Sequence, residues 1–153
     1  MKMNRKGVTL IELIVVIVII GIGAVLFAPN IGAWLPNYRL RSAARDVVST
    51  MRTAQMRAVS TNLQYRINLN PADVGANSYV LERNTGGIWV TEPPIQPLPT
   101  GVTIVGNTLP NQRAEFNQNS TSSSGTLTLQ NSRGTQRRLT ITSSTGRVTI
   151  TTP

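Results

Sequence analysis

The residue best placed to do chemistry in this chain is Glu12, a single carboxylate inside a long apolar segment. Residues 8–28 number 21, and only Thr9 and Glu12 among them are polar. A helix rises about 1.5 Å per residue, so this length can cross a hydrocarbon core of roughly 30 Å. An ionised carboxylate in such a segment costs at least ~2.5 kcal/mol, which predicts a functional role and a cationic partner. The nearest candidate for that partner is the amine that cleavage after Gly7 would create.

Two simpler interpretations of the N-terminal segment explain fewer of its features. A secretory signal peptide also begins with basic residues, but its apolar core has about 7–15 residues and ends at a small-residue cleavage site. The apolar run here is longer, and no such site follows it. A plain membrane anchor fits the length and the hydropathy, but it gives no reason for Glu12 or for the abrupt Lys6-Gly7 junction.

The composition offers no enzymatic chemistry. The chain has no histidine and no cysteine, and its 6 acids are dispersed. No pair of residues suggests general acid–base catalysis or a metal site, so we expect no catalytic residue, no metal and no cofactor. The hydroxyl-rich stretch 120–124 has no evident base and is typical of a solvated loop. We therefore expect the protein to act through assembly and contact.

Arginine carries the positive charge beyond the apolar segment. Both lysines, Lys2 and Lys6, precede Val8, and the rest of the chain has 12 arginines and all 6 acids. With Glu12 set aside, the balance is 12 against 5, a formal +7. Arginine suits bidentate contact with phosphate, so such a surface can attract polyanions, although a solvated surface without a ligand is the commoner meaning.

After the apolar segment, the sequence predicts one small α+β domain over residues 37–153. Apolar residues recur at close to the helical period over 37–61, which predicts a helix with one apolar face and with Arg41, Arg45 and Arg52 on its solvated side. The apolar positions are Leu40, Ala43, Ala44, Val47, Val48, Met51, Ala54 and Ala58. Residues 62–153 are rich in short alternating runs, which predict an antiparallel β-sheet. The expected strands are 64–69, 78–83, 88–91, 102–105, 113–116, 126–130, 138–143 and 147–151.

Turn and loop residues separate these strands. The sequence Asn-Thr-Gly-Gly at 84–87 predicts a hairpin turn. Residues 93–99 are rich in proline and predict a semi-rigid loop, whereas the polar residues 117–125 predict a mobile one.

A combination of motifs stands out at the N-terminus: a basic leader, the run Lys6-Gly7-Val8-Thr9-Leu10-Ile11-Glu12, and Pro29, the twenty-second residue after Gly7. It resembles the class III signal of type IV pilins and type II secretion pseudopilins. The resemblance implies that a prepilin peptidase removes the leader, residues 1–7, on the cytoplasmic side and methylates Val8. It also implies that Pro29 kinks the helix.

The same resemblance places residues 8–36 in a transmembrane helix that becomes part of a filament core. The chain is then a single-pass protein of the inner membrane, with its C-terminal domain periplasmic or extracellular. In the filament, Glu12 meets the cationic N-terminus of an adjacent subunit and sets the axial register, because either charge left alone in a low-dielectric bundle is unfavourable. The implied partners are the prepilin peptidase and other pilins or pseudopilins in a helical filament.

Two later motifs extend this picture: Leu40-Arg41-Ser42-Ala43-Ala44-Arg45-Asp46 in the expected helix, and Thr145-Gly146-Arg147-Val148 near the end. With the order of helix and sheet, they are similar to the GspH/FimT group of minor pilins and pseudopilins. The resemblance implies the pilin fold, a long N-terminal helix packed on a C-terminal antiparallel sheet. It further implies a subunit that assembles into, or primes, a type IV pilus or a type II secretion pseudopilus.

The alternative function is a surface-displayed minor pilin that binds DNA in DNA uptake. Some members of the group bind DNA through a C-terminal Gly-Arg-x-Arg, of which Gly146 and Arg147 match and the second arginine is replaced by Thr149. The binding expected is weak and without sequence preference. Its candidate residues are Arg133, Arg137, Arg138 and Arg147. The last three come together if the final two strands pair across 143–146.

Overall fold

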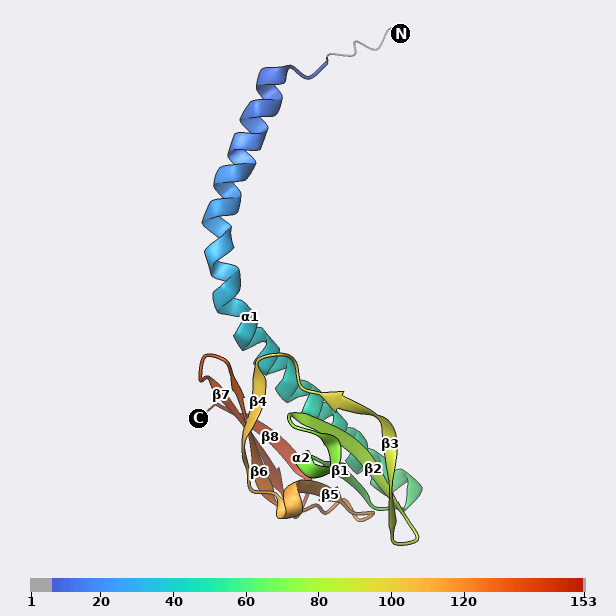
Figure 1. The fold of residues 1–153 in the computed structure, drawn as a ribbon. Coiled ribbons are helices and arrows are strands. Elements are labelled where there is room, and N and C mark those ends of the chain that lie inside the picture. Colours follow the sequence, from blue (N-terminus) through green and yellow to red (C-terminus); the bar gives the residue numbers. More distant parts are fainter. Residues whose placement is uncertain (1–6, 153) are drawn as a thin grey trace, which may run out of the picture. The chain divides into compact units, whose positions relative to one another are not determined.

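The computed structural model describes residues 7–152, apart from the side chains of residues 26–31 and 33. The chain divides into two compact units, Met1–Leu35 and Pro36–Pro153. Of the expected leader, only Gly7 lies within the described residues. Helix α1, Leu10–Thr61, contributes to both units (Figure 1).

In the first unit, the apolar residues of α1 whose side chains are described have no protein core around them. The large apolar side chains described between Val8 and Val25 are 46–76% exposed. Among the described residues, none of the helices combines the length and the apolar character needed to cross a membrane. The span expected over 8–36 includes the seven positions whose side chains are not described. Pro29 is one of these positions, so its kink stays a prediction.

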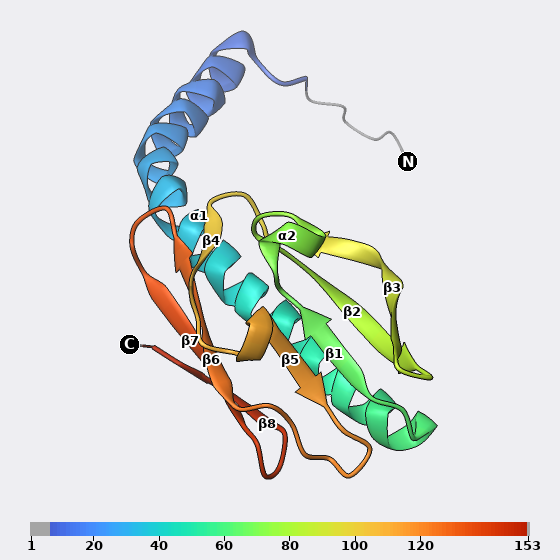
Figure 2. The same ribbon diagram turned by 60° about the horizontal axis from the view of Figure 1, so that its bottom comes forward.

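In the second unit, two antiparallel sheets of four strands each pack along α1 (Figures 1 and 2). The first sheet, in the order β3-β2-β1-β5, comprises β1 (Tyr65–Asn68), β2 (Ser78–Thr85), β3 (Ile88–Pro97) and β5 (Arg113–Phe116). The second, in the order β4-β6-β7-β8, comprises β4 (Val102–Asn107), β6 (Gly125–Asn131), β7 (Gln136–Thr142) and β8 (Arg147–Thr151). A short helix α2 (Pro71–Val74) and a 3₁₀ turn (Pro110–Gln112) complete the unit.

One hydrophobic core joins α1 to both sheets. All of the apolar positions expected on the helix, from Leu40 to Ala58, are buried. They pack with inward-facing strand residues such as Ile67 and Phe116 from the first sheet and Leu129 and Leu139 from the second. Burial of a large apolar side chain contributes about 1.5–3 kcal/mol, so this cluster accounts for the packing of both sheets on one helix.

The α+β prediction and the existence of the strands are confirmed, and three details differ. The strands form two sheets and not one. β3 continues through the proline-rich segment to Pro97, because β3 is an edge strand and proline can be accommodated at a sheet edge. A bulge between Tyr79 and Leu81 absorbs the extra residues of β3. Finally, the segment expected to be mobile is tied down: the Ser122 N–H donates to the Ser143 carbonyl at 2.9 Å, and the Ser123 N–H to the Glu115 carbonyl at 2.9 Å.

Ion pairs cover the outer face of the first sheet. Arg66 Nε donates to Glu82 Oε2 at 2.5 Å, and both side chains are only 10% exposed. The Asn68 amide donates to Glu82 Oε1 at 3.1 Å and to Asp73 Oδ2 at 3.0 Å. The Arg66 guanidinium also lies 4.0 Å from the centre of the Trp89 ring. This network satisfies charges that are otherwise costly to bury.

The same network acts on Asp73. The Asn68 amide, and then Arg113, whose Nη2 lies 2.6 Å from Asp73 Oδ2, hold the pKa of the Asp73 carboxyl below its ordinary value. A lowered folded-state pKa means that ionised Asp73 stabilises the fold at neutral pH. That contribution is lost as the pH falls below about 4 and through the folded value.

Candidate assembly and binding sites

Glu12 and Thr9 cap the start of α1. The Thr9 N–H donates to Glu12 Oε2 at 2.8 Å, and the Thr9 hydroxyl donates to the same oxygen at 2.9 Å. In return, the Glu12 N–H donates to the Thr9 hydroxyl at 3.3 Å. These reciprocal bonds form a capping box, which satisfies N–H groups that the first turn of a helix leaves open.

The capping role of Glu12 was not predicted from the sequence, although the chain contains the sequence pattern of a capping box. A threonine followed three residues later by glutamate, just before an apolar run, predicts a helix start. Glu12 therefore has a local role in addition to the expected contact with an amine. A glutamine at this position can make the same hydrogen bonds without the charge, so the two roles can be separated.

Among the described residues, the surroundings of Glu12 in its own chain offer no cation. The side chains that share a shallow groove with it are Val8, Ile11, Leu13, Val15 and Val16, all apolar. Residues 7–35 contain no lysine or arginine. The Gly7–Val8 bond precedes α1 in a non-helical segment, and Val8 is 76% exposed. The expected cleavage point is therefore accessible in the described structure.

The four arginines expected to bind DNA do not form one cluster. β7 and β8 pair across 143–146 as expected, with Arg147 opposite Thr142 and Arg138 opposite Thr151. Opposite residues share a face, so Arg138 and Arg147 lie on one face of the hairpin. They are four steps apart along the strand, which is about 14 Å. Arg137 belongs to the other face, and Arg133 lies in the turn between β6 and β7.

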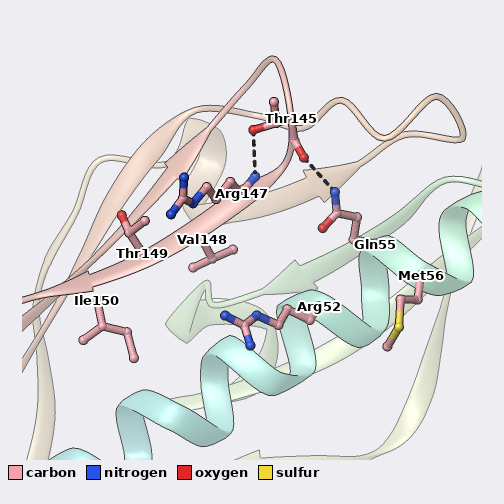
Figure 3. Close-up of a pocket in the computed structure, with 8 residues that line it drawn as sticks. All are labelled: Arg52, Gln55, Met56, Thr145, Arg147, Val148, Thr149 and Ile150. Atoms are coloured by element: carbon pink, nitrogen blue, oxygen red, sulfur yellow. Dashed lines mark hydrogen bonds between the residues drawn. The ribbon is translucent and has the colours of Figure 1, made fainter.

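Two of these arginines, Arg137 and Arg147, also line grooves beside β8 to which arginines of α1 contribute. A groove of 730 Å³ is lined by Arg52, Gln55 and Met56 from the helix and by residues 145 and 147–150, which include Arg147 (Figure 3). A neighbouring groove of 330 Å³ is lined by Arg41, Ala44, Arg45, Arg137 and Ile150. The helix arginines expected on a simply solvated side are exposed, but they also line these grooves. The helical period could not have shown which strand passes beside them.

Gly146 has a structural reason for its place in the Gly-Arg motif. Its φ is +61°, a conformation that glycine adopts readily and other residues rarely. An added Cβ would lie 2.5 Å from Gln55 Nε2, the atom that donates to the Thr145 carbonyl at 2.8 Å. The glycine therefore lets the β7–β8 turn approach α1, and this packing alone explains its presence.

Two family models match the chain. The prokaryotic N-terminal methylation motif matches residues 2–28, and the type II transport protein GspH matches residues 43–146. The chain belongs to the GspH family. No curated protein matches this GspH-family chain at a significant level.

Solved structures share the fold of the GspH-family chain. The type IV minor pilin FimU of Pseudomonas aeruginosa is 18% identical with a TM-score of 0.60, and the match covers 75% of this chain and 90% of that one. A second crystal form of FimU gives 19% identity and a TM-score of 0.57, covering 73% and 92%. The minor pseudopilin EpsH of the Vibrio cholerae type 2 secretion system is 13% identical with a TM-score of 0.60, covering 75% and 98%. The expected pilin fold is thus confirmed.

Proposed function

We propose that this GspH-family protein is a minor subunit that enters or primes a helical filament, either a type IV pilus or a type II secretion pseudopilus. The observation that carries the proposal is the exposed apolar part of α1, whose single carboxylate, Glu12, caps the start of the helix. The fold neighbours, a type IV minor pilin and a minor pseudopilin, support both kinds of filament.

Burial of the N-terminal part of α1 gives the physical drive for assembly. Its described apolar side chains are at least 46% exposed, and covering each large one contributes about 1.5–3 kcal/mol. The inner membrane covers them before assembly, with residues 8–36 as a single span and the C-terminal domain on the far side. In the filament, the helices of neighbouring subunits cover them. Pro29 allows the span to bend as it moves between the two environments.

The charge on Glu12 then sets the position of each subunit. Removal of residues 1–7 by a prepilin peptidase leaves Val8 with a cationic amine, and methylation of that amine keeps its charge. Because residues 7–35 contain no other cation, the partner of Glu12 is the Val8 amine of an adjacent subunit. An unpaired charge in such a bundle is costly, so only the register that pairs the two is favoured.

Processing at Gly7 is the step that tests this proposal first. We expect the protein extracted from membranes of a host with a prepilin peptidase to begin at Val8 and to carry one methyl group. Intact-mass measurement with N-terminal fragmentation reads both features. A host that lacks the peptidase is the control and should yield the full-length chain. Recovery of the full-length chain from both hosts would contradict the proposal.

DNA binding is a second candidate function, favoured by the separation of charge in the second unit. All four acids that follow α1, Asp73, Glu82, Glu92 and Glu115, pair with arginines at the first sheet. The strands of the second sheet contain no acid, and Arg138 and Arg147 are exposed on one face of its last hairpin. Phosphate contacts need only such positive charge in a row.

The DNA candidate predicts weak, salt-dependent binding of duplex DNA by the full chain in detergent micelles. Each phosphate contact contributes about 0.9 to the slope of log K against log salt concentration, so replacing Arg138 and Arg147 by glutamine should lower the slope by about 2. The control is Arg57→Gln, because Arg57 is already paired with Glu92. A titration of labelled duplex at several salt concentrations measures the slope. A slope that stays the same in the double variant would exclude this face as a DNA site.

A further inference from the structure

We propose that the grooves between α1 and β8 bind an extended acidic segment of another protein subunit, which adds to the second sheet as a strand beside β8. The choice of a filament subunit as the source of the segment rests on the proposed function. The preference for an acidic, extended segment rests on the surface itself and is independent of the proposed function.

The two sheets have four edge strands, β3, β5, β4 and β8. Among the described residues, nothing interrupts or covers the edge of β8, whereas the other three edges are protected. At the edge formed by β3, Pro93 and Pro94 remove backbone donors. The edge of β5 is occupied by the bridge between Phe116 and Ser122. The edge of β4 has a bulge after Ile104, whose N–H donates to Asn77 Oδ1 at 3.0 Å. These are devices by which proteins prevent strands from adding to a sheet.

β8 itself is built to accept a partner strand. Its sequence, Arg-Val-Thr-Ile-Thr, has no proline or glycine, and its pairing with β7 runs without a break from Arg147 to Thr151. On its other side β8 has no strand neighbour within the described residues. A row of backbone donors and acceptors is therefore available for β-augmentation, in which main-chain hydrogen bonds supply affinity and alternate side chains supply specificity.

Apolar side chains in the groove fit alternate side chains of an added strand. Ile150 is 37% exposed at the point where the two grooves meet, and Met56 on α1 is 64% exposed in the larger one. Figure 3 shows Val148 and Ile150 on β8 on the side of Arg52 and α1. The 730 Å³ of the larger groove is within the roughly 300–1,000 Å³ typical of ligand sites.

The charge of the grooves selects an acidic occupant. Among the described residues, no carboxylate lines them, and five arginines do: Arg41, Arg45, Arg52, Arg137 and Arg147. A second copy of this chain is a poor source, because its four acids that follow α1 are already in ion pairs. Duplex DNA would use the arginines but neither the backbone edge of β8 nor Ile150 and Met56. An acidic strand with alternate apolar residues would use the arginines, the backbone edge of β8 and the apolar side chains alike.

The proposal is tested by the binding of a fluorescent octapeptide of alternating glutamate and valine to the full chain in detergent micelles. The double variant Arg52→Gln with Arg137→Gln is expected to weaken binding about tenfold, because both arginines line the grooves. Arg138→Gln is the matched control, since Arg138 is on the same hairpin but lines neither groove, and it should change affinity by less than about twofold. The same peptide with every backbone amide methylated should not bind measurably. Thermal unfolding of each variant checks that the fold is kept.

Three results would overturn the inference: no binding of the peptide, equal binding of the methylated peptide, or equal loss of affinity in Arg138→Gln and in the double variant. Displacement of the peptide by duplex DNA together with loss in Arg138→Gln would assign the surface to DNA. The assay uses single chains in micelles, so its failure leaves filament assembly unaffected. Conversely, a Glu12→Gln variant should bind the peptide as the wild type does, even where it fails to assemble.

Discussion

A Glu12→Gln variant is expected to be cut after Gly7 as the wild type is, but to enter filaments at less than about a tenth of the wild-type level, because a tenfold change corresponds to only 1.4 kcal/mol. Glutamine can accept both hydrogen bonds that Glu12 accepts from Thr9, so the start of α1 is preserved. What the variant lacks is the charge, which leaves the neighbouring amine buried without a partner. Removing one member of a buried ion pair typically costs about 3–5 kcal/mol. Immunoblots of sheared filaments against the membrane fraction measure the incorporation.

Two further variants separate the charge of Glu12 from its cap. Thr9→Val removes the hydroxyl from the capping box and keeps the carboxylate, so it should assemble close to the wild-type level. Glu12→Ala removes both roles and should assemble as poorly as Glu12→Gln. If Glu12→Gln assembles normally while Glu12→Ala does not, the cap is what assembly requires, and the proposed pairing with the Val8 amine is wrong.

Local sequence patterns were enough to predict the amphipathic part of α1 and the strands, but not the short helix α2 or the 3₁₀ turn. The helical period places Leu40, Met51 and their neighbours on one face, and all of them are buried. The strands follow from alternation and turn residues, because a half-buried strand imposes a period of two wherever it lies in the sheet. Thr9 and Glu12 could have been added to these predictions, since a capping box is also a local pattern.

What the sequence could not predict depends on contacts between distant residues. Nothing in the strands themselves divides them into two sheets, and nothing in α1 shows that Arg52 lines the same groove as residues of β8. The expected cluster of Arg137, Arg138 and Arg147 is not formed, for a related reason. The hairpin was predicted correctly, but its register and the alternation of faces place these side chains apart. Charge composition gives the number of arginines and not their arrangement.

A Glu82→Ala variant is expected to lower the free energy of unfolding by about 3 kcal/mol, the low end of the cost of breaking a buried ion pair. Arg66 would keep only Glu115, whose Oε1 is 3.9 Å from Arg66 Nη1, and the face of Trp89 as partners. The Asn68 amide would lose one of its two acceptors. Denaturant unfolding of the purified full chain, followed by tryptophan fluorescence, measures the change, and Trp89 reports directly on the network.

The matched control for Glu82→Ala is Arg57→Ala, which breaks the ion pair between Arg57 and Glu92. The Arg57 side chain is 48% exposed, and exposed ion pairs contribute about 0–1 kcal/mol, so this loss should be at least threefold smaller. The comparison isolates burial, because both substitutions remove one partner of an arginine–glutamate pair. Equal losses in the two variants would mean that the Arg66–Glu82 pair is effectively solvated, and that the first sheet is held by its apolar face on α1 alone.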